Sequence, residues 1–139
     1  MATRAVYTFI DNHNVYHVYK HWDGNPAWAL RFIERAIPYS WMGEDPRFEA
    51  ADVAAAFIAG NKKEGGGAVQ LTGGYGGMGD LDYRYEIRFC PEKGELLITG
   101  YQSDLQSSSY GALTREREYT KIFKGVLSEL KANPEIEKL

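Results

Sequence analysis

Near its N-terminus the chain reads RAVYTFIDNHNVYHVYKHWD (residues 4–23), a stretch in which two β-rich runs flank a polar tetrapeptide. The runs are Arg4–Ile10 and Val15–Trp22, and the tetrapeptide is Asp11-Asn12-His13-Asn14. Because Asn and Asp tolerate turn dihedrals, such a cluster between β-branched and aromatic runs predicts a β-hairpin. This hairpin carries all three histidines of the chain.

A four-residue loop fixes which residues of the hairpin face one another. The expected pairs are Ile10 with Val15, Thr8 with His17, Val6 with Tyr19, and Arg4 with His21. Because side chains alternate along a strand, each face collects every second residue. The face that we assign to the core holds Tyr7, Phe9, Tyr16, Val18 and Trp22. The other, half-open face holds Arg4, Thr8, His17, Tyr19 and His21, together with Val6, Ile10 and Val15.

The spacing of His17 and His21 resembles a zinc motif, but that motif requires a helix. On a strand, residues four apart are separated by roughly 13 Å, whereas a zinc ligand lies about 2 Å from the metal. We therefore predict no metal site. Asp23 is two residues beyond His21, a spacing that allows an orienting His–Asp contact, but no Ser or Cys nucleophile is identifiable nearby. The sequence offers no catalytic residues.

Composition limits the class of protein further. A chain of 139 residues predicts one domain, residues 1–139. A general nucleic-acid binder would usually be basic and a DNA mimic far more acidic, so the net charge of −3 argues against both. The ten tyrosines suit ligand stacking or protein interfaces, including those of a homo-oligomer. Cys90 is the single cysteine, so a disulfide framework is excluded. With no signal peptide and no membrane-length apolar run, we expect a cytoplasmic protein that does not bind membranes.

Three helices are predicted. Asn25 can cap the first, with Pro26 at its first position, and Pro38 stops it. The second is expected from Pro46 or Phe48 to Ala59, with Gly60 ending it. The third is expected from near Thr114 to Asn133-Pro134. Its apolar residues fall at helical spacing and are Tyr119, Ile122, Phe123, Val126, Leu127 and Leu130.

Three further strands are expected at Val69–Thr72, Tyr83–Phe89 and Glu95–Tyr101. The glycine-rich residues 73–80 contain G-x-G-x-x-G, but the dinucleotide fingerprint needs a helix after it, and here a strand follows. We favour a connecting loop; a loop that closes over a ligand with Tyr75 is the alternative. The order β-β-α-α-β-β-β-α predicts an α+β fold, with helices on one face of an antiparallel sheet of about five strands. The second face stays open for solvent or a partner.

The opening Thr3–Phe9 (TRAVYTF) and the turn Tyr19–Pro26 (YKHWDGNP) resemble a group of small phage and prophage proteins. In that group the opening is T-R-A-V-x-x-F, and Y-K-H-W/Y-D-G-x-P leads into the first helix. The resemblance implies no catalytic residues. Small phage proteins of this size often act against host defences, by sequestering a signalling nucleotide or by blocking a defence complex. If the chain is phage-encoded, it acts in the host cytoplasm.

These features predict a non-enzymatic binder without a cofactor, which holds an anionic nucleotide-like ligand or a host defence protein. Cations beside aromatic rings can stack a base and pair its phosphates. The residues expected to bind are Arg4, His17, Tyr19, His21, Asp23 and Tyr75, joined by Arg84 and Arg88 if their strand shares the sheet. Two alternatives stay open: a small hydrolase or transferase using His21 and Asp23, and a virion or scaffold component.

Overall fold

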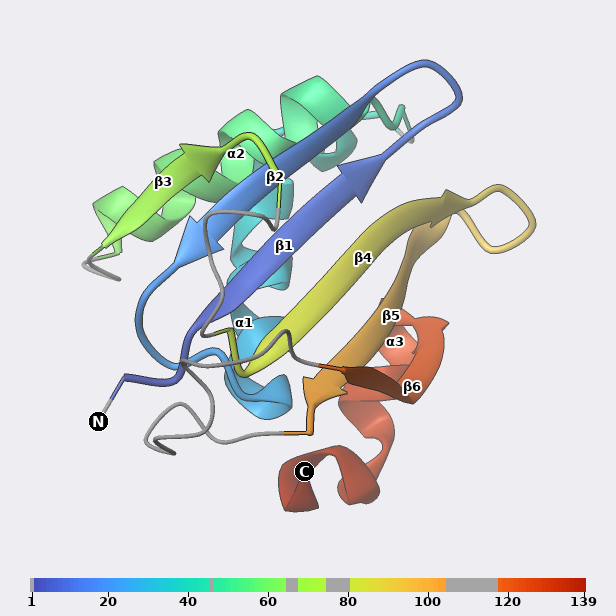
Figure 1. The fold of residues 1–139 in the computed structure, drawn as a ribbon. Coiled ribbons are helices and arrows are strands. Elements are labelled where there is room, and N and C mark those ends of the chain that lie inside the picture. The colour runs from blue at the N-terminus through green and yellow to red at the C-terminus, as the bar shows by residue number, and fades with distance from the viewer. Residues whose placement is uncertain (1, 46, 65–67, 75–80, 105–117) are drawn as a thin grey trace.

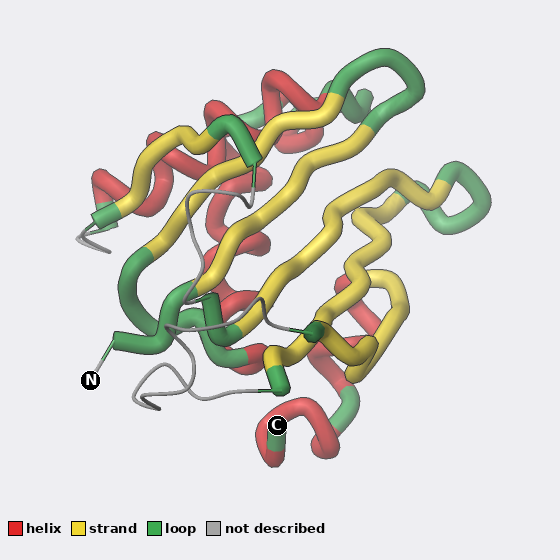
Figure 2. Tube along the Cα trace, viewed as in Figure 1, coloured by secondary structure: helices red, strands yellow, loops and turns green. Residues whose placement is uncertain are grey.

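The protein is described from a computed structural model, which covers residues 2–45, 47–64, 68–74, 81–104 and 118–139. Three helices lie behind one sheet of six strands (Figures 1 and 2). The helices are α1 (Pro26–Ala36), α2 (Ala50–Lys63) and α3 (Leu127–Ala132). The strands are β1 (Ala5–Ile10), β2 (Val15–Lys20), β3 (Val69–Thr72), β4 (Tyr83–Cys90), β5 (Glu95–Ser103) and β6 (Tyr119–Val126). Their order in the sheet is β3-β2-β1-β4-β5-β6.

Short 3-10 turns complete the described chain. They are Ile37–Tyr39, Trp41–Gly43 and Pro134–Lys138. No helix within the described ranges combines the length and apolarity that crossing a membrane requires. The helices and strands together form an α+β fold with the helices on one face of the sheet, as the sequence predicts.

The hairpin β1–β2 has the predicted register. Thr8 faces His17 and Val6 faces Tyr19 in an antiparallel pair. The turn is closed by the Asp11 N–H, which donates to the Asn14 carbonyl at 3.0 Å. Local turn chemistry therefore fixes which side chains of this hairpin point to the helices and which point away.

The sheet departs from the all-antiparallel expectation at its centre, where β1 and β4 run parallel. In that pair Val6 faces Arg84 and Thr8 faces Glu86. Parallel neighbours need a long crossover, and here α1, α2 and the edge strand β3 supply it. Because β2 already occupies one side of β1, β4 pairs with the other, and the sheet is mixed.

The C-terminal helix predicted from near Thr114 is wrong over residues 119–126, which form the sixth strand, β6. The helix α3 begins at Leu127 and has six residues. Lys121 faces Tyr101 and Phe123 faces Gly100, so Ile122 is an extra residue in β6. This bulge breaks the two-residue alternation and gives the apolar residues a spacing that looks helical. The β-branched and aromatic composition of the segment favours a strand.

Helix α2 also differs from its prediction, because it begins at Ala50 and continues past Gly60 to Lys63. Gly60 is buried in the helix and lies against the end of the preceding helical region. A Cβ there would be 3.3 Å from the Arg35 carbonyl oxygen and 3.4 Å from the Tyr39 ring. Gly60 thus permits a close approach of two helical segments instead of ending one.

The core lies between the sheet and the helices and is rich in aromatic rings. The Phe57 ring centroid is 4.5 Å from that of Tyr7 and 5.5 Å from that of Phe9, and Tyr7 stacks on Tyr85 at 5.2 Å. Two residues assigned to the core from the sequence are exposed instead. Tyr16 is 36 % exposed and Trp22 is 46 % exposed, because they lie at the two ends of the β2 region.

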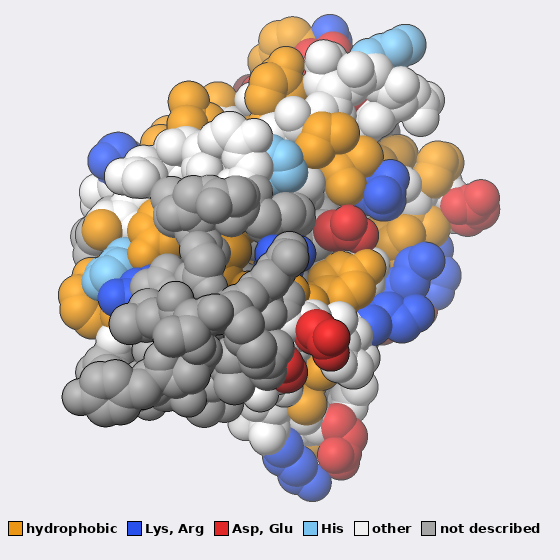
Figure 3. Space-filling view, in the orientation of Figure 1, with side chains coloured by type: hydrophobic (Ala, Val, Ile, Leu, Met, Phe, Trp, Pro, Cys, Tyr) orange, Lys and Arg blue, Asp and Glu red, His pale blue; other side chains and the backbone are white. Residues whose placement is uncertain are grey.

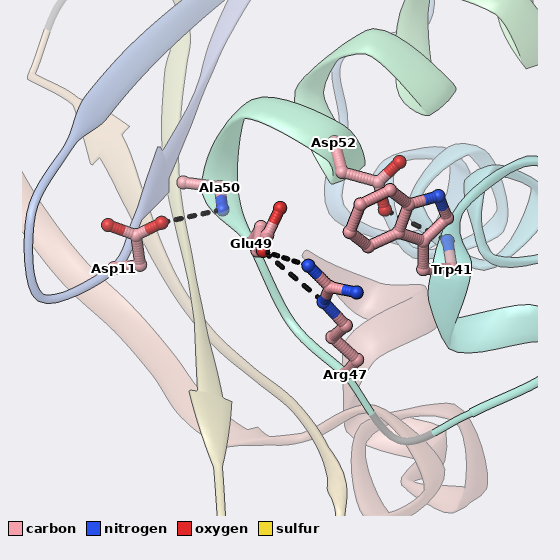
Figure 4. Close-up of polar contacts among 6 residues, drawn as sticks. All are labelled: Asp11, Trp41, Arg47, Glu49, Ala50 and Asp52. Carbon is pink, nitrogen blue, oxygen red and sulfur yellow. Dashed lines mark hydrogen bonds and ion pairs between the residues drawn. The ribbon is translucent and has the colours of Figure 1, made fainter.

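One contact links the hairpin turn to α2. The Asp11 carboxylate accepts a hydrogen bond from the N–H group of Ala50 at 2.9 Å (Figure 4). It also accepts hydrogen bonds from the N–H groups of His13 and Asn14, both at 2.8 Å. Ala50 is the first residue of α2, so Asp11 supplies from 39 residues away the cap that Glu49 does not provide. The Ala50 N–H contributes most to holding the pKa of Asp11 below its ordinary value, ahead of His13 and Asn14.

We expect Asp11→Ala to lower the melting temperature at neutral pH. The folded-state pKa is depressed, so the carboxylate stabilises the fold above its ordinary pKa of 3.8 and loses this effect as the pH falls. The deficit of the variant should therefore shrink in acid. Thermal unfolding at neutral pH and at acidic pH tests this. The control is Asp45→Ala, which removes an exposed aspartate. An equal deficit at neutral and acidic pH would contradict the capping role.

Candidate functional site

The candidate site is the sheet surface opposite the helices, which we call the polar face (Figure 3). The pairing of strands β1 to β6 arranges its side chains in rows across the sheet. One row contains Gln70, Tyr19, Val6, Arg84, Tyr101 and Lys121. The next contains Thr72, His17, Thr8, Glu86, Thr99 and Lys124.

Two histidines are oriented by hydrogen bonds on this face. The Nδ1 atom of His17 is 2.9 Å from the Thr8 hydroxyl across the β1–β2 pair. The Nδ1 atom of His21 is 2.8 Å from the Tyr19 hydroxyl. His17, Tyr19 and His21 are all half-buried. Each imidazole thus has one nitrogen engaged within the protein, which fixes the direction of its ring.

Arg84 lies in the row of Tyr19, two strands away, as the parallel pairing of β1 and β4 requires. Its guanidinium carbon is 3.8 Å from the centroid of the Tyr119 ring, a cation–π contact. The Tyr119 hydroxyl in turn donates to the Leu81 carbonyl at 2.9 Å. The Tyr101 hydroxyl donates to Glu86 at 3.3 Å. The β4–β5–β6 side of the polar face therefore carries aromatic and charged groups that contact one another.

Four of these residues were missed by sequence reasoning. Tyr119, Lys121 and Lys124 were assigned to a helix, and β6 instead carries them to the edge of the polar face. Tyr101 was recognised as a strand residue but without a role. The bulge in β6 is the signal that was missing: with one extra residue between them, Lys121 and Lys124 both face the polar side of the sheet.

Arg4 sits at the start of the face and is half-buried. Its backbone N–H donates to the Asp82 carboxylate at 2.9 Å, and its carbonyl accepts from the Asp82 N–H at 2.9 Å. These bonds attach the residue before β1 to the residue before β4. Arg4 therefore also contributes to joining the two parallel strands.

Asp23 is separated from the predicted site. It is exposed and has φ +56°, a left-handed conformation. Its negative charge reinforces burial in raising the pKa of Tyr7, and it opposes the lowering of the pKa of Lys20 by burial. Tyr7 and Lys20 both lie on the helix side of the sheet. Among the described residues no hydrogen bond joins Asp23 to His21, so the base-and-orienter pair considered from the sequence is not formed.

The remaining predicted residues lie elsewhere. Arg88 is on the same strand as Arg84 but four residues further, about 13 Å along it. It is exposed at the end of β4. Tyr75 lies outside the described residues. The structure thus groups His17, Tyr19, His21 and Arg84 on the polar face, and it places Arg88 and Asp23 away from them.

The polar face is less open than the sequence suggests. Val6 and Thr8, in its central strand, are 0 % and 2 % exposed. Around them His17, Tyr19, Arg84, Glu86 and Tyr101 are half-buried. The groups accessible to a partner therefore lie in a ring around a buried centre.

Burial lowers the pKa of His17 below its ordinary value of 6.5. We expect the imidazole in the folded protein to titrate at a lower pH than in the same protein unfolded in urea. Between the folded-state and unfolded-state pKa values the unfolded chain binds more protons than the folded protein. The contribution of His17 to stability is therefore complete above the unfolded-state pKa and is lost as the pH falls through the folded-state pKa. Side-chain NMR titration measures both values. A folded-state pKa above the unfolded one would contradict the burial of this ring.

Within the described ranges, no three His, Cys, Asp or Glu side chains come together as a metal site would require. No protein family, curated protein or solved structure matches the chain.

Proposed function

We propose that this chain is a non-enzymatic binding protein that holds an anionic, nucleotide-like ligand on the polar face. The observation that carries the proposal is the shared row of Tyr19 and Arg84, which lie two strands apart. Neighbouring strands are about 4.8 Å apart, so these backbones are separated by about 10 Å. That span suits a ligand with an aromatic ring at one end and a phosphate at the other.

The side chains near Tyr19 and those near Arg84 suit the two ends of such a ligand. At one end, Tyr19 and His21 offer aromatic rings whose centroids are 6.1 Å apart and tilted by 58°. A base can stack against such rings. At the other end, the Arg84 guanidinium is a planar donor suited to phosphate, and Lys121 and Lys124 add positive charge at the edge of the face.

One contact favours binding over catalysis. His21 Nδ1 is engaged with Tyr19 and not with an aspartate that would orient a base. The resemblance of Thr3–Phe9 and Tyr19–Pro26 to small phage proteins supports a counter-defence role, in which the chain sequesters a signalling nucleotide of the host. Docking of a host defence protein on the same face is the competing outcome.

The experiment is a thermal-shift series with linear and cyclic nucleotides and with inorganic phosphate. A ligand at about 100 times its Kd should stabilise the fold by about 2.7 kcal/mol. Arg84→Ala should weaken the affinity about tenfold or more, since a hydrogen bond to a charged group is lost. Lys62→Ala is the control, because it removes one exposed positive charge from the helix side.

Two results would contradict nucleotide binding. One is a melting temperature that no nucleotide changes. The other is an equal loss of affinity in Arg84→Ala and Lys62→Ala, which would indicate a general effect of net charge. Chromatography of the purified protein with each nucleotide then distinguishes sequestration, in which the nucleotide is recovered intact, from turnover.

A further inference from the structure

A cavity lies at the end of the sheet where the parallel strands β1 and β4 both finish. From these ends the chain leaves in two directions, because β1 turns into β2 on one side and β4 turns into β5 on the other (Figures 1 and 2). In open α/β sheets, ligands bind in the crevice beyond the carboxyl ends of the strands, at the point where the connections of neighbouring parallel strands diverge. The present sheet contains such a point between its two hairpins.

The crevice is a cavity of about 350 Å³. This volume falls at the lower end of the range for small-molecule sites, about 300–1,000 Å³. Ile10 and Arg88 line it from the polar face, and Phe48 and Phe89 line it from the helix side. Asp11 and Asn12 of the hairpin turn complete the wall. Pro91 also lines the cavity, which is thus built from both faces of the sheet and from residues between 10 and 91.

One wall of the cavity is apolar and aromatic. The rings of Phe48 and Phe89 stack with centroids 5.9 Å apart and planes 12° apart. Both side chains are only half-buried, and Ile10 beside them is also half-buried. Hydrophobic surface is therefore left accessible inside the cavity, where an apolar or aromatic group of a ligand can cover it.

The cavity also contains one positive and one negative side chain. Arg88 is exposed and has no ion-pair or hydrogen-bond partner within the part of the chain that is described. Asp11 accepts three backbone N–H bonds. A carboxylate has about four acceptor positions, so one remains for a ligand. The negative charge of Asp11 would repel a phosphate-bearing ligand. A ligand with one negative and one positive charge instead matches both Arg88 and Asp11.

From this arrangement we propose that the crevice binds a free α-amino acid with an apolar, preferably aromatic, side chain. The ligand carboxylate pairs with the Arg88 guanidinium. Its ammonium group donates to the Asp11 carboxylate and to the side-chain carbonyl of Asn12. Its side chain lies against Phe48 and Phe89. This site is independent of nucleotide binding on the polar face, because Arg84 is about 13 Å along the strand from Arg88.

Isothermal titration calorimetry with L-phenylalanine tests the proposal, with amide chemical-shift mapping to locate the site. Two comparison compounds separate the charges: phenylacetate lacks the ammonium group and phenethylamine lacks the carboxylate. We expect L-phenylalanine to bind more tightly than either, with shifts at Asn12, Arg88 and Phe89. The Arg88→Gln variant should bind L-phenylalanine about tenfold more weakly or worse. The Arg84→Gln variant, its matched control on the same strand, should bind it unchanged.

Three results would overturn the proposal. The first is the absence of heat and of shifts with L-phenylalanine at millimolar concentration. The second is equal affinity of L-phenylalanine for the unmodified protein and for Arg88→Gln with its circular dichroism unchanged. The third is shifts confined to residues outside the crevice. Equal binding of phenylacetate and L-phenylalanine would overturn the role of Asp11. None of these results bears on nucleotide binding, which is measured through Arg84.

Discussion

Phe57→Ala is expected to reduce the free energy of unfolding by about 3–5 kcal/mol, the usual cost of removing a buried phenyl ring. Phe57 is fully buried. Its ring lies between helix α2 and the central strand β1, against Tyr7 and Phe9. Tyr7 is stacked on Tyr85 of β4, so a cavity at this point also removes support from the neighbouring strand. The loss therefore affects the packing on which the whole sheet depends.

Urea denaturation with an unchanged m-value measures this loss. Leu71→Ala is the control, because Leu71 is 68 % exposed on the edge strand β3. It should change stability by no more than about 0.5 kcal/mol. A loss below about 1 kcal/mol in Phe57→Ala would mean that α2 does not anchor the sheet through this ring.

The second large effect is expected at Gly24, in the turn between β2 and α1. A Cβ at this position would be 2.8 Å from the Thr3 carbonyl oxygen and 2.9 Å from the Ala5 Cβ. The Gly24 N–H donates to Thr3 at 2.9 Å, and its carbonyl accepts from the Tyr85 hydroxyl. The Thr3 carbonyl belongs to the backbone and cannot rotate away as the end of a flexible side chain can. Gly24→Ala must therefore shift the start of β1. We expect a cost of about 1–3 kcal/mol.

Gly73→Ala is the matched control for this substitution. A Cβ at Gly73 would meet no atom within 4 Å. Its stability should change by less than about 0.5 kcal/mol. Thermal unfolding of the two variants gives the comparison, and similar melting temperatures would refute the close packing of the Gly24 turn against the beginning of β1.

The N-terminal hairpin could be predicted because its determinants are local. The polar turn around Asp11 and the alternation on either side fix the register, and the pairs Thr8–His17 and Val6–Tyr19 follow from it. The choice of β4 as parallel neighbour of β1 could not be predicted, because it depends on contacts between residues more than 70 positions apart. Alternation in Tyr83–Phe89 indicates a strand but not its partner or its direction.

The candidate site was partly predictable for the same reason. His17, Tyr19 and His21 come from the hairpin, and Arg84 shares their face once the central pairing is known. Tyr119 was hidden, because the bulge in β6 gives that strand a helical spacing of apolar residues. Asp23 was misplaced, because a left-handed turn after β2 ends the alternation on which its assignment depended.

The most direct test of the account is amide chemical-shift mapping of the protein titrated with the nucleotide that stabilises it most in the thermal series. The predicted result is a saturable set of shifts at His17, Tyr19, His21 and Arg84, which is strongly reduced in Arg84→Ala. Shifts confined to the helix side, or none at saturating concentration, would contradict the proposed role of the polar face.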